Sequence, residues 1–350
     1  MWRELTDWLT RARRLIPADD RSILLSPPRL VARFLRFAEH RVTGVAGRST
    51  ADDVRARDPE LVTLLVDLWR VLARYYFRAR FEGVDHVPAR GPVLLVGNHS
   101  GGLLPTEGFL TALAIHDRFG PERAVYALVH DFLFEDPTLR RYAARLGMLR
   151  AGRDSAHHAL AAGTCVLVYP GSDLDTFRRF RDRYRVVLGG RTGFIELALR
   201  ERVPIVPVVS AGNHEQFVVL ARGDRIARWT HAHRWARTEV MPLVLALPWG
   251  LTSGFVPYLP LPAQTTLAFL PAIAWPELPV SAADDPEVVA RCYREVERAM
   301  QAELDRLARG RRYLRGVTRP SAAPMPRRES APARDRAAPA SPATPRSSSR

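Results

Sequence analysis

Residues 93–107 read Val-Leu-Leu-Val-Gly-Asn-His-Ser-Gly-Gly-Leu-Leu-Pro-Thr-Glu, and this stretch decides the fold. The apolar run from Val93 to Val96 predicts a buried strand, and Asn98-His99 follows it directly. The two glycines predict a turn, and Pro105 suits the first turn of a helix. A strand that leads through a turn into a helix is the repeating unit of a layered α/β domain.

The alternation of strand and helix continues as far as residue 209. Short apolar runs predict strands, and the longer segments between them predict helices. The predicted strands are 93–96, 124–129, 165–169 and 205–209, and the predicted helices are 107–117, 137–146, 155–162 and 192–202. We expect a three-layer α/β fold with a mostly parallel or mixed sheet flanked by helices. Its site should lie where strands end and helices begin.

The two ends of the chain differ from this central domain. Residues 1–80 have helical spacing, and Trp2 and Trp8 suggest either an interfacial membrane helix or a helix packed on its own domain. A second helical run covers 59–80, and a late one covers 284–309. We divide the chain into a membrane-interfacial helical region (1–80), an α/β domain (81–315) and a tail (316–350). The tail is mostly Ala, Pro, Ser and Arg, so we expect it to be disordered.

Composition narrows the environment and the partners of the protein. The 350 residues carry a formal net charge of +15 and contain no lysine, so arginine supplies the positive charge. Such a surface attracts anions, including phospholipid head groups. Cys165 and Cys292 are far apart, which fits a reducing compartment and argues against a disulfide or a zinc site. No segment is typical of a secretory signal or a membrane-spanning helix. We expect a peripheral protein on the cytoplasmic face of the membrane.

His99 and Glu107 are the candidate catalytic residues. The turn between them can bring the carboxylate to the imidazole, where it would hold one ring nitrogen as N–H and leave the other as a base. Such a base removes the proton from a hydroxyl as that hydroxyl attacks a thioester, and no covalent enzyme intermediate is needed. Without further context, His99 could instead cap a strand and Glu107 could be an ordinary charge at a helix N-terminus.

Four blocks of sequence give this pair its context. They are Asn98-His99-Ser100-Gly101-Gly102 with Glu107, Gly147-Met-Leu-Arg-Ala-Gly-Arg153, Val168-Tyr169-Pro170-Gly171-Ser172, and Val203-Pro-Ile-Val-Pro207. In this order they resemble the glycerolipid acyltransferase superfamily of the lysophosphatidic-acid acyltransferase type, with most likeness to a bacterial diacylglycerol-acyltransferase-like branch. The resemblance covers roughly residues 81–309.

The resemblance implies an acyl-CoA-dependent O-acyltransferase that acts on a glycerolipid or a related lipid hydroxyl. Acyl-CoA or an acyl carrier protein thioester would be the co-substrate, without a further cofactor or a metal. The implied catalytic residues are His99 as general base and Glu107 as its orienting acid. The implied substrate-binding residues are Asn98, Ser100, Gly101, Gly102, Arg153, Tyr169, Pro170, Gly171 and Ser172.

The sequence departs from the family pattern at two places. The acid of the first block is commonly an aspartate closer to the histidine, whereas here it is Glu107. The third block commonly reads Phe-Pro-Glu-Gly followed by an arginine, but Gly171 stands at the glutamate position and Leu174 at the arginine position. Either Arg178 or Arg179 takes the place of that arginine, or the acceptor has no free phosphate. We favour the second alternative.

Two further segments have both a structural and a functional interpretation. The arginines at 178–185 form either an exposed face or a docking patch for anionic lipid or coenzyme A phosphates. The apolar, proline-broken segment 247–262 is either a surface that dips into one leaflet or a buried loop.

Two other functions compete with acyl transfer. The altered blocks could mark a non-catalytic lipid-binding protein on the same fold. Nucleic-acid binding through the arginines is a weaker alternative, since no nucleic-acid-binding motif accompanies them.

Overall fold

The computed structural model describes residues 53–100, 104–231, 240–254, 256 and 258–317. The expected helix near Trp2, the glycines Gly101 and Gly102, and residues 318–350 of the expected tail lie outside this part. The expected boundary at 316 needs a small correction. Gly316–Val317 form strand β12, which pairs with β11 (Arg311–Arg312), so the ordered chain continues past that boundary.

A seven-stranded sheet has the order β1-β10-β6-β2-β5-β3-β4. Its strands are β1 (Arg80–Glu82), β2 (Val93–Gly97), β3 (Val125–Val129), β4 (Met148–Arg150), β5 (Cys165–Val168), β6 (Ile205–Ala211) and β10 (Thr266–Phe269). β10 is antiparallel to β6, and the other neighbours pair in parallel. The predicted α/β class with a mostly parallel, mixed sheet is confirmed. The four predicted strands are present within two residues, whereas β1, β4 and β10 were not predicted.

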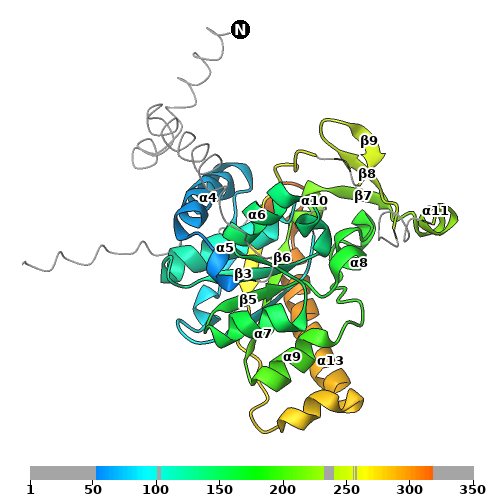
Figure 1. The fold of residues 1–350 in the computed structure, drawn as a ribbon. Helices are drawn as coiled ribbons and strands as arrows, with labels where there is room; N and C mark the ends of the chain where they lie inside the picture. The colour runs from blue at the N-terminus through cyan, green and yellow to red at the C-terminus, as the bar shows by residue number, and fades with distance from the viewer. Residues whose placement is uncertain (1–52, 101–103, 232–239, 255, 257, 318–350) are drawn as a thin grey trace, which may run out of the picture. The chain divides into compact units, whose positions relative to one another are not determined.

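Helices cover both faces of this sheet, which gives three layers (Figure 1). Successive side chains of a strand point to opposite faces. Leu94 and Val96 of β2 pack with α7, α9 and α13, while Val93 and Leu95 pack with α4 and α5. The longer helices are α4 (Pro59–Val71), α5 (Thr106–Phe119), α6 (Pro137–Arg145), α7 (Arg153–Ala161), α9 (Gly193–Glu201) and α13 (Pro286–Ala308). The predicted helices that lie within the described residues are confirmed, and among them only the one at 59–80 has a wrong end.

That helix ends early. α4 stops at Val71, and a π-helical turn carries the chain to Tyr76. Arg78 then adopts a left-handed backbone conformation, with φ of 44°, which turns the chain into β1. Within α4, Trp69 stacks on Phe109 of α5 with ring centroids 4.6 Å apart. The described part of the N-terminal region therefore shares the core of the α/β domain.

A second, three-stranded antiparallel sheet lies outside the main one (Figure 1). It consists of β7 (Val218–Ala221), β8 (Leu243–Ala246) and β9 (Gly250–Ser253), and α11 (Asp224–Trp229) follows β7. The segment 247–262, which contains β9, exposes Leu247, Trp249 and Leu251. The start of the segment is therefore exposed, whereas Gly254 and Pro260 are buried. Among the described residues, no helix combines the length and the apolar character needed to cross a membrane.

Candidate active site

His99 and Glu107 lie at the carboxyl end of β2, the central strand of the main sheet. β2 ends at Gly97, and Glu107 is in the first turn of α5. His99 Nδ1 is 2.5 Å from Glu107 Oε1, so the expected contact between the two side chains is present. The Glu107 side chain is 1% exposed, whereas that of His99 is 18% exposed. Because a carboxylate only accepts hydrogen bonds, Nδ1 carries the proton and Nε2 keeps its lone pair.

Glu107 is held by donors from two other parts of the chain. The Ser100 N–H donates to Oε1 at 3.0 Å, and Asn213 Nδ2 donates to Oε2 at 3.1 Å. The carboxylate also lies at the N-terminus of α5, where the helix dipole favours negative charge. These contacts leave Glu107 a single position, which in turn fixes the plane of the imidazole.

Tyr169 contacts the other side of the catalytic histidine. Its ring stacks on the His99 ring with centroids 4.8 Å apart and an interplanar angle of 24°. The phenol is buried, and burial raises its pKa well above the ordinary value. Gly97 makes this position possible, because a Cβ at residue 97 would overlap the Tyr169 ring. The expected substrate contact of Tyr169 stays a prediction, and the observed contact is with the His99 ring.

The third-block turn supports His99 through its backbone. The His99 N–H donates to Asp175 Oδ2 at 2.5 Å, and Asp175 is paired with Arg178 in a buried ion pair. Burial raises the pKa of Asp175 to about 6, although the Arg178 guanidinium acts in the opposite direction. A Cβ at Gly171 would overlap the Val187 carbonyl and Asp175. No side chain fits at residue 171 in this backbone, which explains the missing glutamate.

The short helix α10 (Asn213–Gln216) holds the start of α5. Thr106 Oγ1 donates to Gln216 Oε1 at 2.8 Å and accepts from Asn213 Nδ2 at 2.6 Å. On its other side, Glu215 forms a buried ion pair with Arg311 at 2.6 Å.

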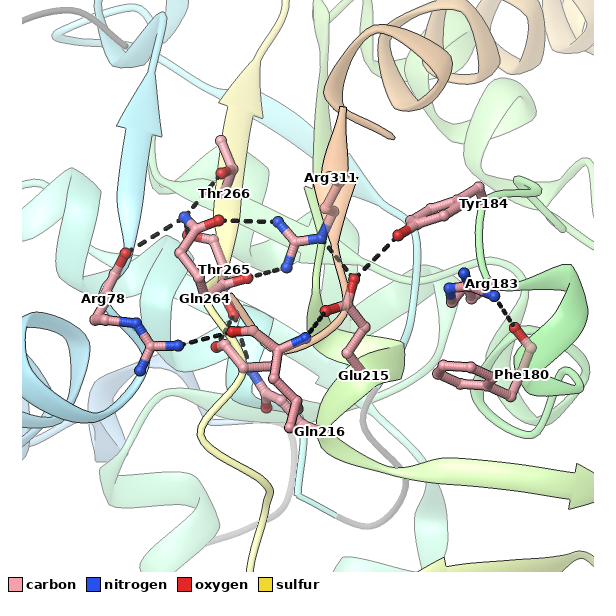
Figure 2. Close-up of polar contacts among 12 residues, drawn as sticks. Arg78, Phe180, Arg183, Tyr184, Glu215, Gln216, Gln264, Thr265, Thr266 and Arg311 are labelled. Atoms are coloured by element: carbon pink, nitrogen blue, oxygen red, sulfur yellow. Dashed lines mark hydrogen bonds and ion pairs between the residues drawn. The ribbon is translucent and has the colours of Figure 1, made fainter. Parts of the chain in front are cut away.

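Figure 2 shows how further polar groups complete this anchor. Arg311 also donates to Gln264, and Tyr184 donates to Glu215 at 3.1 Å. The backbone N–H of Leu314 donates to the second Glu215 oxygen at 2.8 Å. The segment 311–314 and residue 264 are therefore linked through α10 to Glu107.

The remaining predicted site residues lie at varying distances from His99. Asn98 is buried, and both of its amide atoms bond the backbone of Ser210, at 2.8 and 3.0 Å. Pro170 and Ser172 belong to the third-block turn, where Ser172 has a φ of 44°. Arg153 opens α7 after β4, three strands from β2 in the sheet order, and its 69% exposed side chain pairs with Glu196. The structure does not bring Arg153 into contact with His99.

Four residues near the catalytic pair were not among the predicted site residues. They are Gly97, Thr106, Asp175 and Asn213. Gly97 had a detectable signal, because a glycine at the end of an apolar strand marks a close approach. Asp175 flanks the third-block turn and Asn213 follows a strand end, and both positions favoured a structural role. Their contacts with the site had no signal, since they lie 76 and 106 residues from their partners.

An apolar cavity of about 190 Å³ lies beside the loop that follows His99. It is lined by Trp69, Leu72, Tyr76, Phe77, Leu104, Leu259 and Pro260. Leu104 connects it to the turn before α5. Among the described residues, no group of three or more His, Cys, Asp or Glu side chains is arranged to hold a metal ion.

Comparisons with known proteins show which proteins the chain resembles. The family model Acyltransferase matches residues 78–211. An uncharacterised protein of Mycobacterium tuberculosis is 32% identical over 81% of this chain and 76% of its own length. A human 2-acylglycerol O-acyltransferase 3 is 26% identical over 52% of this chain and 54% of its own.

A solved structure also resembles the chain. It is the 1-acyl-sn-glycerophosphate acyltransferase PlsC from Thermotoga maritima, with a TM-score of 0.44 and 15% identity over 80% of this chain and 95% of that chain. The family match covers β2, the catalytic pair, the third-block turn and β6. The chain belongs to the glycerolipid acyltransferase superfamily.

Proposed function

We propose that the protein transfers a fatty acyl group from a thioester to a lipid hydroxyl, with His99 as the general base and Glu107 as the residue that orients it. The observation that carries the proposal is the 2.5 Å contact between His99 Nδ1 and the buried Glu107 carboxylate. This contact leaves Nε2 of His99 as the basic atom, and His99 is the partly exposed member of the pair.

The reaction balances without a covalent enzyme intermediate. Nε2 of His99 takes the hydroxyl proton as the acceptor oxygen attacks the thioester carbonyl. The C–S bond then breaks, the ester forms, and the imidazolium returns its proton to the departing thiolate. Glu107 stabilises the imidazolium that exists between these two steps.

The acceptor in this proposal has no free phosphate group, as in a diacylglycerol, a long-chain alcohol or a lysophospholipid with a head group. Arg178 is buried against Asp175, so it is not available as the substitute arginine of the third block. Arg153 is paired with Glu196 and remote from His99. Both observations remove candidates for a phosphate-binding group at the catalytic pair.

The donor is acyl-CoA or an acyl carrier protein thioester. Arg179 and Arg181 are exposed beyond the third-block turn and contact only Asp182 among the described acidic side chains. Two arginines that share one carboxylate leave net positive charge for coenzyme A phosphates or for an acidic carrier protein. We place the enzyme at the cytoplasmic face of the membrane, as a peripheral protein.

The test is acyl transfer by His99→Ala. Purified full-length protein is incubated with radiolabelled acyl-CoA and a panel of diacylglycerol, lysophospholipids and fatty alcohols in detergent. The substitution should lower turnover by about 10²–10⁴-fold without changing the thermal unfolding curve. His157→Ala is the matched control, because His157 is exposed and bonded to Glu201 at 2.8 Å on the surface. Full activity of His99→Ala would refute the mechanism.

The lipid-binding alternative makes a different prediction in the same assay. It requires lipid association without any acceptor-dependent consumption of thioester by the unsubstituted protein. Glu107 and the altered third block were the two signs of lost catalysis. The direct contact between Glu107 and the imidazole speaks against the first of them.

A further inference from the structure

Exposed apolar side chains are concentrated in one part of the described chain. Nine of the fourteen large hydrophobic residues that are exposed there lie between Leu220 and Leu259. They are Leu220, Ile226, Trp229, Leu243, Leu245, Leu247, Trp249, Leu251 and Leu259. Single exposed leucines are ordinary, but a contiguous group of this size marks an interaction surface.

The β7–β9 sheet separates its residues into two faces. Along β8, Leu243 and Leu245 are exposed, whereas Val244 and Ala246 are buried against Phe177 and Phe217. Leu245 pairs directly with Leu251 of β9, so both side chains lie on the same outer face, where they are 47% and 61% exposed. A strand in water normally places polar residues on such a face, and here it places leucines.

The outer face continues toward the catalytic loop. Beyond β8, Leu247 pairs with Leu259 across an isolated bridge, and both are exposed. Leu259 and Pro260 also line the apolar cavity that reaches Leu104. Apolar surface therefore extends from the small sheet to the turn before α5.

The charge beside this face indicates which partner covers it. α11 exposes Ile226 and Trp229, three residues apart on one side of the helix, together with Arg225 and Arg228. The described residues 220–231 contain three arginines and one acidic residue. Arginine and tryptophan at the edge of an apolar surface are typical of contact with anionic head groups. A second copy of this chain would oppose like charges, which disfavours self-association.

We propose that the outer face of β7–β9, together with α11, inserts into one leaflet of an anionic bilayer. The inference rests on the proposed function, for which it names the membrane-docking surface. The leucines reach the acyl-chain boundary, and the arginines and Trp229 lie at head-group level. The cavity bounded by Leu259 then opens at the depth from which a lipid acceptor enters.

A fluorescent label at Leu251 tests the surface directly. Cys165 and Cys292 are buried, so the thiol of Leu251→Cys is the accessible site for a polarity-sensitive dye. On vesicles of phosphatidylglycerol and phosphatidylcholine its emission should shift to the blue. Leu139→Cys is the matched control, because Leu139 is 46% exposed on α6, and its label should not shift. Protein that sediments with vesicles while the Leu251 label stays in water would overturn the proposal.

A second variant separates docking from catalysis. The double variant Leu245→Ser, Leu251→Ser should partition to vesicles about tenfold more weakly, or more weakly still. The reason is that two leucine side chains no longer contact the acyl chains of the bilayer. It should keep its turnover on detergent-dispersed acceptor. His99→Ala should bind vesicles like the unsubstituted chain, so a failed mechanism and a failed docking surface give different results.

Other occupants of the face would also be detected. A blue-shifted Leu251 label without vesicles, with a dimer that the double variant dissolves in sedimentation velocity, would assign the face to self-association. The same blue shift in a monomer would mean that another part of the chain covers it. Either result would overturn the membrane assignment.

Discussion

The carboxyl edge of the main sheet and the β7–β9 sheet distribute polar and apolar side chains in opposite ways. At the edge, Glu107, Asp175 and Glu215 are buried carboxylates, and each one is bonded to named donors. In the small sheet, Leu245 and Leu251 are exposed leucines. Burying a charge without a partner is costly, and so is exposing an apolar face to water.

This difference separates two requirements of the protein. The buried carboxylates hold one imidazole in one orientation, which needs a rigid and fully bonded interior. Leucine side chains form no directional hydrogen bonds, so their surface suits a fluid and variable partner. Substitutions of the buried carboxylates should change turnover or stability, and substitutions of the exposed leucines should change neither stability nor turnover on detergent-dispersed acceptor.

Glu107→Gln should have the largest effect. The glutamine amide keeps the shape of the side chain, but its NH₂ group would face the N–H donors that now bond the carboxylate. The neutral amide also no longer stabilises the imidazolium. Turnover on detergent-dispersed acceptor should fall by about 10³–10⁴-fold. Glu196→Gln is the control, since Glu196 is a partly buried carboxylate on α9 that contacts Arg153 and Thr192. Comparable losses in both variants would contradict a specific role for Glu107.

Arg311→Met should have the second largest effect. It leaves the Glu215 carboxylate buried without its cation, which costs about 3–5 kcal/mol in the free energy of unfolding. Turnover should also fall, because α10 carries Asn213 against Glu107. Denaturant unfolding measures the first effect. Arg306→Met removes an exposed arginine of α13 and should cost less than about 1 kcal/mol. Equal losses would mean that burial of the pair is unimportant.

The pH dependence of stability should contain a contribution from Asp175. Its pKa is raised from 3.8 to about 6, so between these values the folded chain binds more protons than the unfolded chain. The contribution of this group to the free energy of unfolding therefore decreases as the pH rises through this window, by about 3 kcal/mol at most. Asp175→Asn should lack this slope. Urea unfolding at several pH values measures how the free energy of unfolding of each protein changes with pH. The same slope in both proteins would contradict the contribution of Asp175.

Gly97→Ala should have a smaller effect on stability. The added Cβ overlaps the Tyr169 ring, so the ring must leave its stacked position on His99. Overpacking of this kind costs about 1–3 kcal/mol, and turnover should fall with it. Gly193→Ala is the matched control, because a Cβ there meets no neighbouring atom. An unchanged melting temperature and turnover in Gly97→Ala would show that the ring position is not critical.

Leu243→Ser should have the smallest effect on folding. The side chain is exposed on the outer face of β8, so the free energy of unfolding should change by less than about 0.5 kcal/mol. The adjacent Val244→Ser, on the buried face, should cost about 2 kcal/mol or more. Thermal unfolding of the pair measures the asymmetry between the two faces. Similar costs at both positions would remove the contrast on which the docking surface depends.

Much of the fold was predictable because its signals are local. The apolar runs of β2, β3, β5 and β6 each identify a strand without reference to the rest of the chain. β1 and β4 have three residues each and β10 has four, and their pairing depends on the neighbouring strands. The antiparallel pairing of β10 with β6 therefore could not be derived from the sequence.

The contact between His99 and Glu107 was predictable for the same reason, since only the turn between β2 and α5 separates this pair of residues. The support of that pair was not predictable. Asn213 and Asp175 reach the site from other strand ends, and only the three-dimensional arrangement of the sheet brings them together. The third block gave a partial signal. Its missing glutamate indicated a departure from the family pattern, but not that Gly171 leaves no room for a side chain.

The buried Arg311–Glu215 pair has a consequence for biosynthesis. During translation, His99 and Glu107 leave the ribosome long before Arg311 is added to the chain. Until then Glu215 lacks its cation, and α10 has no bond to the hairpin that secures it. The buried carboxylate is therefore compensated only late in synthesis, and proteolytic removal of the segment from Arg311 onward would leave Glu215 buried without its cation again.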